Sequence, residues 1–381
     1  MPKRISILGS TGSIGVNTLK IVSQLQEDID VFYLSCNKNA SLLIEQAIQF
    51  NVKAVCIVDK NYVSQVQHAL ESYDIEVLEG RDGLLELSER NNVDILLNGL
   101  VGASGMEPTL RAIEAGINVA LSNKESLVMA GKIIKRAMEI SKAKLFPVDS
   151  EHSAIWQCLV GENIEDVRRL IITGSGGPFL RRNMETFHEV TIQEALNHPN
   201  WDMGNKISID SATMMNKGFE VIEAFWLFGF KSEFIDIIIH PQSIIHSMIE
   251  FKDASIKAQL GIPDMKVPIQ YALTYPRHID TPWEKLDFFS CQDFTFEEPD
   301  FERFPCMRLA FESLEKDGTA SAVLNLSNDY AVARFLNDEI KFTDIPLINE
   351  SSIHLHEWVQ NPTLDDLKLL DDWVKNHVSS Y

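Results

Sequence analysis

The stretch Gly9-Ser10-Thr11-Gly12-Ser13-Ile14-Gly15 decides the fold, because it joins a short apolar run at Arg4–Leu8 to a segment with helical spacing at Ile14–Leu25. Glycines allow a backbone to approach a pyrophosphate closely, and a helix N-terminus offers N–H groups at the positive end of its dipole. The spacing is GxxGxxG rather than the usual GxGxxG. Alone, the stretch predicts a nucleotide-binding turn, with an ordinary turn before a helix as the alternative.

Working outward from this loop, short apolar runs alternate with helical patterns over the first 149 residues. The expected strands are Arg4–Leu8, Asp30–Ser35, Ala54–Val58, Glu76–Leu78, Asp94–Asn98, Asn118–Leu121 and Lys144–Val148. Helical spacing lies between them, for example at Ser41–Phe50. Such alternation predicts an α/β domain with a Rossmann-like parallel sheet and helices on both faces.

The rest of the chain predicts a different organisation. Residues 150–274 mix strand patterns with an amphipathic helix at Gly218–Phe230, which indicates a central α+β domain. Its expected strands are Arg169–Thr173, Ile235–Ile239, Ser243–Phe251 and Ile256–Leu260, the last two antiparallel. Residues 275–300 lose periodicity and read as a linker, and residues 301–381 predict a C-terminal helical domain. The polar and aromatic stretch from Asn197 to Lys206 predicts a loop.

Composition restricts the partners. The 381 residues are 45% hydrophobic and carry a formal net charge of -21, with no run of Lys or Arg. So acidic a surface repels phosphate backbones and anionic lipids, which argues against nucleic acid and membranes as partners. A small anionic substrate is still compatible with this charge, because distant surface charges are screened from a local basic pocket.

Cysteine usage and the N-terminus indicate a cytoplasmic location. The five cysteines are scattered and include no CxxC pair, which fits a reducing cytosol better than a disulfide framework. The apolar run that starts at Ile5 is too short for a signal peptide. No stretch approaches the ~18 apolar residues of a membrane span. We therefore expect a soluble protein.

The end of the second expected strand indicates which dinucleotide binds. Enzymes that use NAD usually place Asp or Glu there to bind the ribose 2′-hydroxyl. This chain has Asn37, Lys38 and Asn39 instead, and Lys38 suits a 2′-phosphate. The strand end therefore favours NADPH over NADH, with a solvated surface lysine as the alternative.

A second polar cluster, Ser122-Asn123-Lys124-Glu125-Ser126, follows the strand Asn118–Leu121. The carboxyl end of a parallel strand is the edge of the sheet where ligands bind. The cluster is therefore a candidate binding element. It also fits an ordinary helix start, capped by Ser122 with Glu125 completing a capping box, and both interpretations can hold at once.

Acidic residues follow the last strand of the first domain. Asp149 and Glu151 are two positions apart, so an extended backbone would place both carboxylates on one side. Oxygen ligands suit Mg²⁺ or Mn²⁺ better than zinc, and a solvated acidic loop is the alternative. Glu220 and Glu223 share one face of an expected helix, and either could supply a third carboxylate.

Small polar residues further along are candidates for binding a phosphate or sugar hydroxyls. Ser211, Asn216 and Lys217 are short-range donors, and Ser175 lies in a glycine-rich turn able to surround an anion. His198 and Trp201 lie in the expected loop, where a lone histidine is more often an ordinary surface residue. With Trp201 beside it, the loop also fits a lid that excludes water from a substrate.

Together these motifs resemble the 1-deoxy-D-xylulose 5-phosphate reductoisomerase family. The resemblance runs in order from residue 1 to about residue 350, and it is carried by GSTGSIG, SNKES, PVDSEH, TGSGGPF, HPNW-x-MG, ISIDSATMMNKG-x-E and IHPQS-x-x-HSM. It implies a homodimer with an NADPH domain (1–149), a catalytic domain that binds metal and substrate (150–274), a linker (275–300) and a helical domain (301–381). It also implies conversion of 1-deoxy-D-xylulose 5-phosphate to 2-C-methyl-D-erythritol 4-phosphate in isoprenoid precursor synthesis, and inhibition by the metal chelator fosmidomycin.

The resemblance further implies a role for each matching residue. The cofactor residues would be Thr11, Gly12, Ser13, Ile14, Asn37, Lys38, Asn39, Asn123, Glu125 and Gly204. The substrate residues would be Lys124, Ser150, Glu151, Ser175, His198, Trp201, Ser211, Asn216, Lys217 and Glu220. Asp149, Glu151 and Glu220 would bind Mn²⁺ or Mg²⁺ and, with Lys124, form the catalytic group. The family often has Gly where this chain has Asn37, which affects only the fine geometry of the 2′-phosphate pocket.

Two rival functions fit parts of the sequence. A simple NADP-dependent dehydrogenase would explain the glycine loop but leave the three carboxylates without a task. A non-catalytic dinucleotide sensor, with the C-terminal helices as its partner surface, would need neither a metal nor a lid. The favoured hypothesis is a metal-assisted rearrangement of the carbon skeleton to an aldehyde, followed by hydride reduction.

Overall fold

The computed structural model describes residues 2–25, 27–198, 201, 204–291 and 293–381. The chain forms two compact units. The first unit contains Met1–Ser126, Lys132–Ser153 and Asp264–Thr281, and the second contains Leu127–Gly131, Ala154–Pro263 and Pro282–Tyr381. The expected division into four parts stays a prediction.

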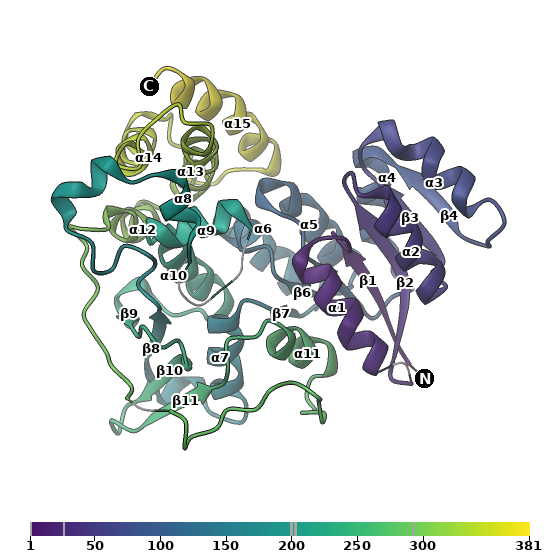
Figure 1. Cartoon of the computed structure of the whole chain (residues 1–381), viewed down its shortest axis with the longest axis horizontal. Coiled ribbons are helices and arrows are strands. Elements are labelled where there is room, and N and C mark those ends of the chain that lie inside the picture. Colours follow the sequence, from purple (N-terminus) through teal and green to yellow (C-terminus); the bar gives the residue numbers. More distant parts are fainter. Residues whose placement is uncertain (1, 26, 199–200, 202–203, 292) are drawn as a thin grey trace. The chain divides into compact units, whose positions relative to one another are not determined.

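The first unit is built on a seven-stranded parallel sheet in the order β4-β3-β2-β1-β5-β6-β7 (Figure 1). Its strands are β1 (Lys3–Leu8), β2 (Ile29–Cys36), β3 (Ala54–Ile57), β4 (Glu76–Glu79), β5 (Ile95–Asn98), β6 (Asn118–Leu121) and β7 (Leu145–Pro147). All seven expected strands are confirmed, with ends that differ by at most one residue. The central strands are apolar on both faces, as in β1, where Ile5, Ile7 and Leu8 are fully buried.

Helices connect the parallel strands of the first unit, and one further helix, α11, joins the unit from later in the chain. They are α1 (Ser13–Gln24), α2 (Ala40–Phe50), α3 (Val63–Leu70), α4 (Gly80–Glu89), α5 (Met106–Glu114), α6 (Lys124–Ser141) and α11 (Lys266–Thr274). The strand order reverses at β1, which pairs with β2 on one side and β5 on the other. In sheets of this type ligands bind beyond the carboxyl ends of the strands at this reversal, so the loops after β1 and β5 border the expected crevice.

The second unit contains a four-stranded mixed sheet in the order β11-β10-β8-β9. Its strands are β8 (Val167–Gly174), β9 (Ile235–Ile239), β10 (Ile245–Phe251) and β11 (Ile256–Leu260). The last two strands are antiparallel, as expected, whereas β8 and β9 are parallel. The α+β prediction for the middle of the chain is therefore confirmed.

Helices make up most of the remaining second unit. They are α8 (Ile192–Leu196), α9 (Asn205–Ala212), α10 (Met215–Phe228), α12 (Pro305–Lys316), α13 (Ala320–Leu336), α14 (Asp344–Leu355) and α15 (Leu364–Ser379), while α7 (Ser150–Leu159) continues from the first unit. Figure 1 shows α13, α14 and α15 side by side in yellow-green to yellow. The predicted C-terminal helical region is confirmed. A shared apolar core ties α10 to it, through Phe219 and Ile222 packed with Leu309 and Leu324.

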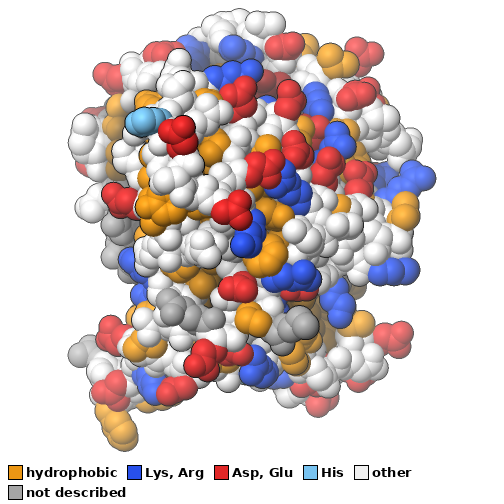
Figure 2. All heavy atoms as spheres, turned by 90° about the vertical axis from the view of Figure 1, so that its right-hand side faces the viewer, with side chains coloured by type: hydrophobic (Ala, Val, Ile, Leu, Met, Phe, Trp, Pro, Cys, Tyr) orange, Lys and Arg blue, Asp and Glu red, His pale blue; other side chains and the backbone are white. Residues whose placement is uncertain are grey.

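The surface carries charges of both signs (Figure 2). On the face drawn in Figure 2, acidic side chains are interspersed with basic ones over the surface. Among the described residues, no helix is both long enough and apolar enough to cross a membrane.

The glycine loop generates a test of the fold. A Cβ atom on Gly15 would lie 2.4 Å from the Gly9 carbonyl oxygen and 2.4 Å from the Ser10 Cα, so Gly15→Ala must displace backbone. We expect a loss of ~1–3 kcal/mol in the free energy of unfolding, from overpacking, and weaker NADPH binding. Thermal denaturation and fluorescence titration measure the two effects.

Gly12→Ala is the matched control for stability, because the nearest atom to its new Cβ would be at 3.4 Å, an ordinary contact. If Gly15→Ala melts at the same temperature as Gly12→Ala, the close approach of loop and helix is wrong.

Candidate functional site

The loop after β1 presents backbone N–H groups at the start of α1. Gly9 has φ +78, and Gly12 is the residue before the first helical turn. Gly12 and Ser13 are exposed, while Thr11 and Ile14 are half-buried. A helix start with exposed backbone and no side-chain cap is suited to an anion such as a pyrophosphate.

The end of β2 lies beside this loop. Burial raises the pKa of the Cys36 thiol to about 11, against the effect of a hydrogen bond with the Thr11 hydroxyl. Asn37, Lys38 and Asn39 follow directly and are all exposed. Asn39 also caps α2 by accepting the Leu42 N–H at 3.3 Å. The structure thus brings the expected pyrophosphate and 2′-phosphate residues to one edge of the sheet.

Asn123 organises the loop after β6. Its Oδ1 accepts the Ser126 N–H at 3.1 Å, so Asn123 caps α6 rather than Ser122, and the expected cap is wrong. Its Nδ2 donates to the Glu125 carboxylate at 3.0 Å. Both side chains are buried, and the hydrogen bond fixes the Glu125 carboxylate beside the Asn123 amide.

Asn98 is a structural residue that the sequence analysis missed. It is fully buried at the end of β5, where its Nδ2 donates to the Gly105 carbonyl at 2.9 Å and the Thr109 hydroxyl at 2.7 Å. Its Oδ1 accepts the Leu100 N–H at 3.0 Å, and Asn123 donates to the Leu100 carbonyl at 3.1 Å. Together the two amides fix the loop after β5. An asparagine that ends an apolar buried strand is the signal that could have identified it.

Lys124, Asp149 and His152 form a buried charged group in the first unit. Lys124 Nζ lies 2.7 Å from one Asp149 oxygen, and His152 Nδ1 lies 3.2 Å from the other. Burial would raise the pKa of Asp149, but the Lys124 charge and the His152 hydrogen bond outweigh it and hold that pKa well below its usual value. Asp149 is therefore an ionised carboxylate in a partly desolvated setting.

Glu151 adds a second carboxylate to this group. Contrary to the extended backbone expected, α7 begins at Ser150, and the Glu151 N–H donates to Asp149 Oδ1 at 3.2 Å. Ser150 Oγ donates to Glu151 Oε2 at 2.7 Å. Ligand oxygens of Asp149 and Glu151 lie within 4.8 Å of one another. This donor set, oxygen-rich and doubly negative, fits a hard divalent cation.

In the second unit, a glycine turn brings three expected substrate residues together. Ser175 follows β8, and a Cβ on Gly177 would lie 2.5 Å from the Ser211 carbonyl oxygen. A Cβ on Gly174 would lie 3.0 Å from the Lys217 Cε. Gly177, with φ +69 and backbone at 2.5 Å, can only be glycine, and the turn lies directly against α9 and the start of α10.

His198 joins this cluster. Its Nε2 lies 3.3 Å from Ser175 Oγ, and its Nδ1 accepts the Trp201 N–H at 3.0 Å. An acceptor at Nδ1 requires the neutral ring to carry its proton on Nε2, which can then donate to Ser175. Burial, and next the Lys217 charge, lower the pKa of His198 to about 4. Residues 199–200 and 202–203 of the expected lid lie outside the described residues.

Glu220 lies on the inner side of α10 with two polar partners. It is fully buried, and it accepts hydrogen bonds from Asn216 Nδ2 at 2.6 Å and Lys217 Nζ at 2.5 Å. Glu223, the other candidate, is equally buried one turn later. The expected phosphate-binding and metal-binding side chains of α10 therefore lie together at its start.

Gly204 lies in the expected loop, directly before a helix that the sequence analysis did not predict. It is the exposed residue that precedes α9, and α9 includes Asn205 and Lys206, which the sequence had predicted as loop. The correction arises because α9 has only two buried apolar residues, Ile209 and Ala212, too few to produce a helical pattern.

Family models match almost the whole chain. A model described as 1-deoxy-D-xylulose 5-phosphate reductoisomerase matches residues 5–131, and the C-terminal domain model of the same name matches residues 145–228. A third, described as DXP reductoisomerase C-terminal domain, matches residues 260–377.

Curated relatives agree along their full lengths. A 1-deoxy-D-xylulose 5-phosphate reductoisomerase of Chloroherpeton thalassium is 48% identical over 376 residues, covering 99% of this chain and 97% of the relative. One from Bacteroides fragilis is 46% identical over 369 residues, covering 97% and 95%.

Solved structures share the fold. The reductoisomerase from Zymomonas mobilis, in complex with NADPH, has a TM-score of 0.94 at 41% identity and covers 100% of this chain and 99% of its own. A DOX-P reductoisomerase in complex with NADPH, fosmidomycin and magnesium has a TM-score of 0.93 at 36% identity, covering 99% and 98%.

The low pKa of His198 generates a prediction about pH. The folded value is about 4 and the ordinary value 6.5, so between them the unfolded chain binds a proton that the folded chain does not. The half-buried, neutral His198 contributes its full stabilisation above its ordinary pKa of 6.5. This contribution is lost as pH falls toward the folded-state pKa of about 4. His198→Gln removes it, so the variant should lose less stability than wild type between about pH 7 and about pH 5. Denaturant unfolding at both values measures this, and equal losses would contradict the assignment.

Proposed function

The chain belongs to the 1-deoxy-D-xylulose 5-phosphate reductoisomerase family, and we propose that it converts 1-deoxy-D-xylulose 5-phosphate to 2-C-methyl-D-erythritol 4-phosphate for isoprenoid precursor synthesis. NADPH is the hydride donor, and Mg²⁺ or Mn²⁺ is the metal. The observation that carries the proposal is the group formed by the buried Lys124 and the half-buried Asp149 and Glu151. These residues follow strands β6 and β7 of the parallel sheet, and the loops after β1 and β2 of the same sheet suit a dinucleotide. A simple dehydrogenase has no need for these paired carboxylates.

The cofactor residues follow the edge of the first sheet. Thr11, Gly12, Ser13 and Ile14 would bind the pyrophosphate with the backbone of α1, and Asn37, Lys38 and Asn39 would meet the 2′-phosphate. Asn123, Glu125 and Gly204 would complete the cofactor site. No carboxylate stands at the end of β2, which supports NADPH rather than NADH.

Asp149, Glu151 and Glu220 would hold the metal. When bound, the metal would supply Lewis acidity at the substrate carbonyl, and NADPH would supply the hydride. Ser150 orients Glu151 by its hydrogen bond, and His152 orients Asp149.

The chain's own groups bind the substrate and stabilise charge. Ser175, Ser211, Asn216 and Lys217 would bind the phosphate, and the neutral His198 would donate from Nε2 to a substrate oxygen. Lys124 Nζ, held by Asp149, is placed to stabilise negative charge as it develops on oxygen during the rearrangement. Trp201 would exclude water from the substrate.

Two further properties follow from the family. We propose a homodimer, which is supported by exposed phenylalanines in the second unit: Phe288, Phe289, Phe294, Phe296 and Phe301. We also propose a cytoplasmic location, which is supported by five free cysteines. Both belong to the proposal.

The function is tested by following NADPH absorbance with 1-deoxy-D-xylulose 5-phosphate, before and after removal of divalent metal by a chelator. We expect oxidation that is lost with the metal and restored by Mn²⁺ or Mg²⁺. Fosmidomycin should inhibit it. Bound NADPH without oxidation under any of these conditions would reject the proposed reaction and favour the sensor.

Glu151→Gln tests the metal assignment. The variant keeps the shape of the side chain but removes one negative charge, so we expect turnover to fall by ~100-fold or more while NADPH binding is unchanged. Glu165→Gln, an exposed glutamate, is the control and should behave as wild type. If Glu151→Gln retains full activity, Glu151 is not a metal ligand.

A further inference from the structure

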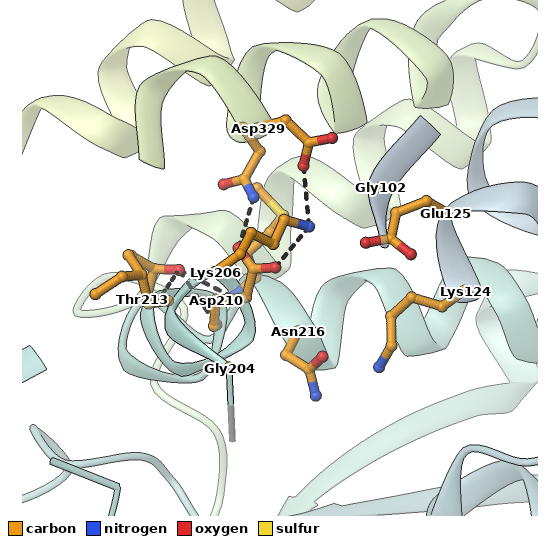
Figure 3. Close-up of polar contacts among 12 residues, drawn as sticks. Gly102, Lys124, Glu125, Gly204, Lys206, Asp210, Thr213, Asn216 and Asp329 are labelled. Carbon is orange, nitrogen blue, oxygen red and sulfur yellow. Dashed lines mark hydrogen bonds and ion pairs between the residues drawn. The ribbon is translucent and has the colours of Figure 1, made fainter. Parts of the chain in front are cut away.

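Helix α9 carries a buried acid that the proposed reaction does not use. Asp210 is 2% exposed, and its carboxylate is 2.8 Å from Lys206 Nζ on the same helix. Lys206 is also 3.0 Å from Asp329 on α13, so it lies between two acids, as Figure 3 shows. Asp210 has a second partner, Asn328 on α13, whose Nδ2 donates to Asp210 Oδ1 at 2.6 Å. Asp210 thus ties α9 to the C-terminal helices.

The tie continues into the C-terminal helices through buried amides. Asn349 Nδ2 on α14 donates to Asn328 Oδ1 at 3.2 Å, and Ser327 Oγ donates to Asn349 Oδ1 at 3.0 Å. Asn328, Asn349 and Ser327 are all fully buried. Every link is satisfied at both ends, which is the condition under which a buried polar network makes a structure rigid.

The two helices that carry substrate residues are fixed in different ways. Met215, Phe219 and Ile222 of α10 pack in an apolar core with α12, where a Cβ on Gly218 would lie 2.8 Å from the Ala310 Cβ. In α9 the buried residues are Ser208, Ile209, Asp210 and Ala212, two of them polar. The rotation of α9 about its axis therefore depends more on the Asp210 tie than on apolar packing.

The Asp210–Asn328 hydrogen bond lies next to Ser211, so a small rotation of α9 would move a substrate residue. Ser211 is the next residue after Asp210, and its carbonyl oxygen limits the approach of Gly177 in the turn that carries Ser175. Successive residues of a helix point ~100° apart, so any turn of α9 moves Ser211 as well as Asp210. A change at Asn328 is therefore transmitted to Ser211 without touching the substrate.

We propose that Asp210 and Asn328 are positioning residues, which set the rotation of α9 so that Ser211 meets the substrate phosphate. The inference rests on the proposed function, in which Ser211 binds that phosphate. The C-terminal helices would then contribute to substrate binding, because the Asn328 amide of α13 fixes α9, which carries Ser211.

A matched pair of substitutions tests the proposal. Asn325 lies three residues before Asn328 on α13 and is also fully buried, but its amide has no hydrogen-bond partner among the described residues. Asn328→Leu and Asn325→Leu are therefore the same change at the same depth, and only the first breaks the tie. If Asn328→Leu does not fold, Asn328→Ser replaces it as the smaller change.

For Asn328→Leu we expect the KM for 1-deoxy-D-xylulose 5-phosphate to rise about tenfold, the effect of losing one hydrogen bond to a charged group. The dissociation constant of NADPH should not change, and Asn325→Leu should match wild type in KM. If the two variants have equal KM values, whatever their melting temperatures, the positioning role is rejected.

Amide hydrogen exchange of residues 208–213 provides a readout that needs no turnover. Exchange there should be faster in Asn328→Leu than in Asn325→Leu, and equal rates overturn the inference. If wild type does not turn over the sugar phosphate, the proposed function fails, but the exchange comparison still decides whether Asn328 holds α9.

Discussion

Burial of the Asp149 carboxylate is the constraint around which the first unit is arranged. A carboxylate taken out of water must be paired, and removal of a partner leaves an uncompensated charge at a cost of ~3–5 kcal/mol. Lys124 and His152 provide the pairing at 2.7 and 3.2 Å. Each comes from the start of a helix that follows a parallel strand, so the sheet and its loops bring the three groups together. The pairing holds the pKa of Asp149 well below its usual value, so this carboxylate stays ionised although it is largely removed from water.

The second unit also contains a buried carboxylate, Glu220, which is paired with residues of its own helix. Glu220 is fully buried with Asn216 and Lys217, which precede it on the same helix by four and three residues. Because these partners are local, the arrangement depends mainly on the formation of α10 itself. The apolar face of that helix, packed on α12, then fixes where the polar group lies. In both units, therefore, the packing of helices and strands brings buried carboxylates beside the groups that pair with them.

The sequence predicted those features that depend on local pattern. Strands such as β5 and β6 are continuous apolar runs, and the glycines around β1 mark a turn that other residues cannot adopt. The sequence-based predictions were wrong where the start of a helix had to be placed to within one turn. Glu151 was expected on an extended chain, yet it lies in the first turn of α7, since Asp149 accepts its N–H. Ser122 was expected as a cap, yet the longer side chain of Asn123 also reaches the neighbouring loop.

Features set by long-range polar contacts were missed for another reason. Asp210 has the composition of an ordinary loop or surface residue, and nothing adjacent in sequence shows that it is buried, whereas Asn98 could have been identified from its place at the end of an apolar strand. Besides Lys206 on its own helix, Asp210 has a partner 118 residues away, Asn328, on a helix whose sequence predicts only packing. A pattern with period 3.6 identifies an apolar face, but it cannot show that Asn328 in that face points at a distant carboxylate. The role of the buried amides of α13 therefore follows from tertiary contacts between helices, which the sequence pattern does not show.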